Sequence, residues 1–161
     1  MSLSAMSLAD WCWLATVAYG LHILEEFTLD WRNWARNLFG LPVEWSDFYV
    51  VNALVIVLGA VAAELAASAP RLALSFPALM LINATFFHVA PFIATRGRFS
   101  PGLITAVVLF YPIALACYWR AMADGATTGT VLTSLVIGAV LMASPIVLLK
   151  IKDRPYFRQD A

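Results

Sequence analysis

Long runs of apolar residues alternate with short polar breaks along this chain. Five of the runs approach the roughly 20 residues that an α-helix needs to cross the hydrocarbon core of a membrane. The fourth run begins at Ser100-Pro101, where a hydroxyl that can cap a helix is followed by proline at the first helical position. We therefore predict an all-α integral membrane bundle of five transmembrane helices, at about residues 9–27, 48–67, 72–95, 101–122 and 130–150.

The connection between the first two predicted spans is the longest, and it has an amphipathic pattern. Asp30 can cap the start of a short helix and Gly40 can end it. An amphipathic helix of this kind lies in the membrane interface, and we predict one at about residues 31–39. Its simplest role is an anchor, and its sharper role is a lid beside the polar residues that precede it. The apolar face holds Trp31, Trp34, Ala35, Leu38 and Phe39, and the polar face holds Arg32, Asn33, Arg36 and Asn37.

Composition supports a membrane protein. The 161 residues are 62% hydrophobic and 12% charged, whereas soluble domains are about 25% charged. We interpret residues 1–161 as a single membrane domain whose surface contacts membrane lipid. The net charge is zero, so we expect no nucleic-acid partner, and the sequence leaves open whether the chain forms a homo-oligomer. No Lys or Arg precedes the first apolar run, so we expect no cleaved signal peptide.

Positive charges are distributed unequally between the two sides of the predicted bundle. With five spans, the side that holds the N-terminus carries only Arg71 and Arg120. Because positively charged loops remain in the cytoplasm, we predict an N-terminus outside and a cytoplasmic C-terminus. The other side carries eight of the ten Lys and Arg residues: Arg32, Arg36, Arg96, Arg98, Lys150, Lys152, Arg154 and Arg158.

The run His22-Ile23-Leu24-Glu25-Glu26 places an imidazole and two carboxylates within one turn of the first predicted span. Residues three and four apart are neighbours on a helix, so these three side chains share one face. Ionisable groups at membrane depth are costly and usually face a bundle interior or a cavity. One interpretation is a polar network that only fixes helix register. One asparagine would do that at less cost, so we favour a functional site.

Further polar residues fall in the same, cytoplasmic half of the predicted bundle. Asn83 and His88 differ by about 140° around a helix axis, so both can face one site only if the helix deforms. Pro91 permits this, because it removes the hydrogen bond to the carbonyl four residues earlier. We expect the side chains of His22, Glu26 and His88 to meet in one cavity, with Asn52 or Asn83 as a partner. The expected substrate contacts are Asn52, Asn83, Thr105 and Phe87.

Acid–base catalysis by His22, Glu25, Glu26 and His88 is our first chemical hypothesis. Two close, buried carboxylates share a proton more readily than both ionise. One Glu could then donate a proton, and a histidine could relay it. This chemistry suits isomerisation or cyclisation of a lipid-like or isoprenoid substrate.

A metal-dependent membrane enzyme at the same residues is the alternative. His22, Glu26 and His88 offer two imidazoles and a carboxylate, which suit zinc with an open position or non-haem iron. The cofactor is therefore unassigned, with a divalent metal as the candidate. A third class is a proton-coupled transporter or small-molecule binding protein, although a short chain without a repeat offers little machinery for alternating access.

At these residues the chain resembles the HXXEE family of small bacterial integral membrane proteins, which is named for the motif formed here by His22, Glu25 and Glu26. The downstream Asn83 and His88, and the pair Pro101-Gly102, also resemble that family's pattern. The resemblance implies a multi-pass protein of the bacterial inner membrane, and it implies no reaction. A looser likeness to the emopamil-binding, sterol-isomerase group rests on the His-x-x-x-Glu formed by His22 and Glu26, and it implies proton transfer on a lipid.

Overall fold

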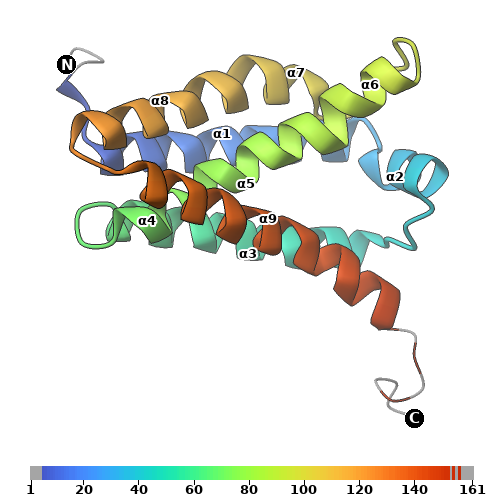
Figure 1. The fold of residues 1–161 in the computed structure, drawn as a ribbon. Coiled ribbons are helices and arrows are strands. Elements are labelled where there is room, and N and C mark those ends of the chain that lie inside the picture. The colour runs from blue at the N-terminus through green and yellow to red at the C-terminus, as the bar shows by residue number, and fades with distance from the viewer. Residues whose placement is uncertain (1–4, 153, 155, 157–161) are drawn as a thin grey trace.

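The computed structural model describes residues 5–152, 154 and 156, and within them it contains helices and no strands. Figure 1 shows the long helices running along one common direction, with α2 and the end of α6 at the same end of the molecule. The predicted all-α class is confirmed. The long helical segments are α1 (Leu8–Thr28), α3 (Trp45–Leu65), a segment from Pro70 to Ala94, a segment from Leu103 to Ala123, and α9 (Thr128–Ile151).

Four of these segments are long and apolar enough to cross a membrane: α3, Pro70–Ala94, Leu103–Ala123 and α9. The helix α1 has 21 residues but is not one of the four, and the carboxylates of Asp10, Glu25 and Glu26 reduce its hydropathy. Large apolar side chains cover the outside of the bundle, as they do on surfaces that contact lipid. The fold is thus that of an all-helical membrane protein.

Local hydrogen bonds define where the helices begin. At the start of α1, the Ser7 hydroxyl accepts from the Asp10 amide at 3.2 Å, and the Asp10 carboxylate accepts from the Ser7 amide at 2.8 Å. The Asp47 carboxylate likewise accepts from the Glu44 amide, at 2.9 Å, where α3 begins. These reciprocal contacts satisfy amide groups that have no partner within the helix.

The short helix α2 spans Trp31–Phe39, the range predicted from the amphipathic pattern. Gly40 ends it with a φ of 63°, as expected. Asp30 occupies the N-cap position, as predicted, but its side chain makes no capping bond to a backbone amide and instead accepts from Asn33 Nδ2 at 2.7 Å. The buried face of α2 rests on the rest of the protein through Trp34 and Ala35, which pack with Val43 and Leu149.

Two of the long segments contain a π-helical turn. The first segment consists of α4 (Pro70–Ala73), α5 (Ser75–Asn83), η2 (Ala84–Val89) and α6 (Ala90–Ala94). The second consists of α7 (Leu103–Thr105), η3 (Ala106–Phe110) and α8 (Tyr111–Ala123). Each π-helix is followed closely by a proline, Pro91 or Pro112, which supplies no amide for the preceding turn. The helix deformation expected near Pro91 is therefore present as η2.

Small residues let the helices pack closely. A Cβ atom added at Gly59 of α3 would lie 2.5 Å from Thr16 Oγ1 of α1, and one added at Gly138 of α9 would lie 2.8 Å from the Leu79 amide nitrogen of α5. Helix interfaces in membranes depend on such contacts, because apolar burial provides little drive within lipid. The Gly138 contact places α9 directly against Ala78 and the backbone of α5.

Replacement of Gly138 should therefore destabilise the fold. We expect Gly138→Ala to lower the free energy of unfolding by about 1–3 kcal/mol, because the new methyl group meets rigid backbone. Unfolding in mixed detergent micelles would measure this. Gly20→Ala is the matched control, since nothing lies within 4 Å of the added Cβ. Equal stability of the two variants would show that the α5–α9 contact is not close.

Candidate functional site

Three polar side chains from two helices converge inside the bundle. Glu26 Oε1 lies 3.4 Å from His22 Nε2 on the same helix and 3.5 Å from His88 Nε2 on η2. One nitrogen or oxygen atom from each residue lies within 4.8 Å of the others. All three side chains are buried, with both histidines at 0% exposure. The predicted convergence of these three side chains is confirmed, but only Glu26 among them lines a cavity in the described part of the chain.

The second ring nitrogen of His22 is held by Thr105. His22 Nδ1 lies 2.8 Å from Thr105 Oγ1, and that hydroxyl donates its single proton to Glu25 Oε2 at 2.6 Å. A hydroxyl whose proton is engaged can only accept from the imidazole, so Nδ1 carries the proton of His22. The Nε2 atom therefore presents a lone pair toward Glu26.

Ser100 has the same effect on His88. His88 Nδ1 lies 3.0 Å from Ser100 Oγ, and the serine hydroxyl donates to the Phe87 carbonyl at 3.2 Å. Pro91 has no N–H to offer this carbonyl, so the carbonyl can accept the serine proton. His88 consequently donates through Nδ1 and presents a lone pair at Nε2.

Hydrogen-bond acceptors of all three residues therefore face one another at the centre of the site. Within the described part of the chain, the Nε2 atoms of His22 and His88 have no hydrogen-bond partner. The facing oxygen belongs to the Glu26 carboxylate, which when ionised can only accept. Buried polar groups almost always have partners, so this arrangement calls for a bound cation or a shared proton.

Glu25 has a different environment from its neighbour. Its carboxylate accepts from the amides of Gly102 at 3.1 Å, Ile104 at 3.1 Å and Thr105 at 2.8 Å, in addition to the Thr105 hydroxyl. These amides begin the Leu103–Ala123 segment, where a negative charge also interacts favourably with the helix dipole. Glu25 therefore fastens this segment to α1, and its oxygens are directed to that helix start and not to the centre of the site.

Gly102 lies between the two imidazole rings. Its φ is 96°, in the region that favours glycine. A Cβ atom here would lie 2.5 Å from His88 Cε1 and 2.7 Å from His22 Cε1. The two rings, whose centroids are 4.8 Å apart, can approach each other only because this position has no side chain.

Aromatic rings enclose the histidines. The Phe110 ring centroid lies 4.3 Å from that of His22, and the Tyr19 ring meets His22 edge-on at 5.7 Å. Trp34 of α2 stacks parallel to His88, with ring centroids 6.5 Å apart. The short helix α2 therefore takes part in covering the site.

Ion pairs attach α2 to the start of α3. Glu44 Oε2 accepts from Arg32 Nη2 at 2.5 Å, and Glu44 Oε1 pairs with Arg36. Hydrogen bonds from these two guanidinium groups hold the pKa of Glu44 below its ordinary value. The pairs are exposed, so each contributes modestly to stability.

An apolar cavity of about 80 Å³ adjoins Glu26. Three of the four predicted substrate contacts, Asn52, Asn83 and Phe87, line it together with Glu26. Thr105 does not line it and instead contacts His22 and Glu25. Asn52 and Asn83, expected as partners of the site, line this cavity with Glu26, whereas the Nδ1 atoms of the histidines contact Thr105 and Ser100.

Two residues of the site were not identified from the sequence in their actual roles. Ser100 was expected to cap a helix beginning at Pro101, but the helix begins at Leu103 and the hydroxyl holds His88. Gly102 was noted only as part of the pair Pro101-Gly102. One sequence signal could have identified both residues. They lie in the loop between the helical segment that carries His88 and the segment that faces His22.

Fold and site together define a class: an all-helical membrane protein with a buried His-Glu-His cluster. The family described as "protein of unknown function with HXXEE motif" matches residues 13–117, a stretch that includes all three residues of the cluster. The chain belongs to the HXXEE family. A search of curated proteins and a search of solved structures each found no match, and nothing supports the looser likeness to the emopamil-binding group.

A substitution that adds a methyl group at Gly102 tests its close contact with the two histidines. Gly102→Ala should lower the free energy of unfolding by about 1–3 kcal/mol more than Gly125→Ala, because only the first meets a packed site. Gly125 is a matched control: its φ is 94° and nothing lies within 4 Å of its added Cβ, so it carries the backbone strain alone. Thermal unfolding would compare them, and equal losses would contradict the close ring packing.

Proposed function

We propose that this protein is a membrane-embedded enzyme that acts on a lipid-like or isoprenoid substrate at His22, Glu26 and His88. The observation that carries the proposal is the meeting of two imidazole lone pairs and a carboxylate in a buried site. Such a cluster is costly in a membrane protein, and a functional role accounts for its cost. The adjoining apolar cavity supports an apolar substrate, since ligand sites combine mainly apolar walls with a few placed polar groups.

A divalent metal is the occupant that the geometry supports best. Two Nε2 atoms and a carboxylate oxygen form a three-ligand set, which leaves an open position as in catalytic zinc and non-haem iron sites. Both histidines donate through Nδ1 to a hydroxyl, and metal-binding histidines are oriented by such contacts. A metal with an open position would polarise a carbonyl or activate water. Glu25 would act as a positioning residue through Thr105.

Acid–base proton transfer at the same residues is the second candidate. Its support is the position of Glu26 Oε1, which lies within 3.5 Å of the Nε2 atoms of both histidines. One proton held among these three groups would remove the conflict between acceptors. In this version the relay consists of Glu26, His22 and His88, because the oxygens of Glu25 are engaged with the start of α7.

We further propose that α1 is a fifth span and that α2 lies in the interface. The helix α1 packs within the core of the bundle beside the four apolar segments, and its length of 21 residues is sufficient to cross a bilayer. Eight of the ten Lys and Arg residues then fall on the side of α2 and the C-terminal tail. That side would face the cytoplasm of the bacterial inner membrane, and the site would lie in the adjacent half of the bilayer.

Metal analysis separates the two enzyme candidates. Protein purified without chelator should contain close to one equivalent of zinc or iron per chain by inductively coupled plasma mass spectrometry. His22→Ala and His88→Ala should each lower the affinity more than about 100-fold, because loss of a ligand costs more than loss of its supporting contacts. Glu64→Gln, a change of an exposed carboxylate on α3, is the control for Glu26→Gln and should retain the metal.

The opposite outcome is also defined. Metal-free protein with a protonated-carboxyl infrared band at neutral pH, lost in Glu26→Gln and kept in Glu64→Gln, would replace the metal site by proton transfer. Absence of both metal and band would overturn both candidates.

Reporter fusions test the proposed topology. A reporter joined after Lys152 should read cytoplasmic, and one inserted after Gly125, between α8 and α9, should read external, because the positive charges cluster on the tail side. Two identical readings would show that α9, which separates these two points, does not cross the membrane. Reversed readings would contradict the orientation and move the site to the outer half of the membrane.

A further inference from the structure

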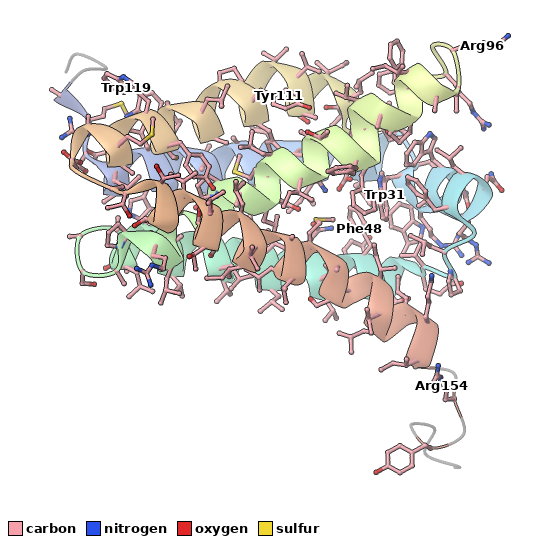
Figure 2. All side chains as sticks on the ribbon, in the orientation of Figure 1. Trp31, Phe48, Arg96, Tyr111, Trp119 and Arg154 are labelled. Carbon is pink, nitrogen blue, oxygen red and sulfur yellow. The ribbon has the colours of Figure 1, made fainter. Side chains whose placement is uncertain are left out.

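The cavity beside Glu26 has two polar atoms without partners on its lining residues. Trp31 Nε1 and Asn83 Oδ1 are buried and make no hydrogen bond to the residues that the structure describes, and both residues line the cavity. Figure 2 shows Trp31 next to Phe48, another lining residue, and their ring centroids are 5.9 Å apart. An indole N–H can only donate, and an amide oxygen can only accept. A ligand that satisfies both must offer an acceptor and a donor.

The cavity adjoins a groove between α3 and α9. The groove has a volume of about 450 Å³. Asp47, Val51, Pro145 and Leu149 line both spaces, so the groove and the cavity adjoin. The groove walls are mainly apolar, and an ion pair between Lys152 Nζ and Asp47 Oδ2, at 2.6 Å, joins the two helices there. In the proposed topology α3 and α9 cross the membrane, so the groove between them would face the bilayer.

Size and charge restrict what the cavity can hold. A water molecule has a share of about 30 Å³ in the liquid, so a space of 80 Å³ takes a small polar group and a few carbons, with the remaining chain in the groove. The Glu26 carboxylate in the lining disfavours an anionic head, whereas the Asp47 carboxylate is already paired with Lys152. A hydroxyl is neutral, small, and both donor and acceptor.

We propose that this cavity binds the hydroxyl end of a single-chain lipid alcohol, which reaches it from the bilayer between α3 and α9. The hydroxyl accepts from Trp31 Nε1 and donates to Asn83 Oδ1, and the chain lies along Val51 and Leu149. This inference rests on the proposed function and names its substrate class. The bound hydroxyl would lie beside Glu26, the residue that connects the cavity to the two histidines.

Photolabelling in lipid nanodiscs tests the proposal. The probe is hexadecanol with a diazirine near its hydroxyl, and the labelled peptides are identified by mass spectrometry. We expect labels on residues around the bound hydroxyl, which include Trp31 and Asn83, and on the shared lining of α3 and α9. Unlabelled hexadecanol should compete at least about tenfold better than hexadecane, which can form neither hydrogen bond, and better than hexadecanoate.

Two variants with matched controls locate the site. Asn83→Leu should weaken labelling about tenfold by removing the acceptor, whereas Asn37→Leu, on the exposed face of α2, should not. Val51→Trp should block the passage from groove to cavity, whereas Val57→Trp, on the exposed side of α3, should not. Metal content of each variant, measured in parallel, reports on the proposed function separately, because none of these residues is one of the three ligands.

Several results would overturn the inference. They are unchanged labelling in both Asn83→Leu and Val51→Trp, better competition by hexadecanoate than by hexadecanol, and labels confined to residues that line neither the cavity nor the groove. If metal binds while any of these holds, the lipid alcohol is wrong and the metal centre stands. If labelling follows the proposal in metal-free protein, the cavity assignment stands without the metal.

Discussion

The Glu25 carboxylate joins two segments that are about 80 residues apart, and the geometry of the site depends on this joint. Its four hydrogen bonds hold the start of the Leu103–Ala123 segment against α1. That position brings Thr105 to His22 and puts Gly102 between the two imidazole rings. Glu25 is partly buried, and a carboxylate with four charge-assisted bonds is a strong connection. Without it, neither the tautomer of His22 nor the spacing of the rings would be specified.

The two adjacent glutamates therefore divide their work. Consecutive residues on a helix point about 100° apart, so Glu25 reaches the neighbouring helix start while Glu26 faces the histidines. Glu25 is stabilised by four hydrogen-bond donors and holds two helical segments together. Glu26 lies among acceptors and supplies the unsatisfied charge on which any chemistry would depend. The two adjacent glutamates thus place a group that joins two helical segments and a group available for chemistry within a single helical turn.

The sequence predicted much of this arrangement, and the reasons for the failures are physical. The helix ranges and the convergence of His22, Glu26 and His88 followed from hydropathy and from helical spacing, both of which are local properties. The role of Ser100 did not follow, because a hydroxyl that caps a helix and a hydroxyl that holds a histidine have the same local sequence pattern. The role of Glu25 did not follow either. Their partners lie far away in the chain, and only the packed structure identifies them. The five-span count and the chemistry remain predictions.

The π-helix η2 has a consequence for how this protein can change. In a π-helix the backbone bond runs from residue i to i+5, so the turn at η2 brings Asn83 and His88 closer to one face than the about 140° of a regular α-helix would. The extra residue in this turn changes which way the following side chains point. The α5 residues can therefore pack on α9 at Gly138 while His88, beyond the turn, faces α1. Substitutions that adjust one interface need not rotate the other. The contacts of α5 with α9 can therefore stay the same while the residues around His88 change. This allows related chains to share the cluster and differ in what they bind.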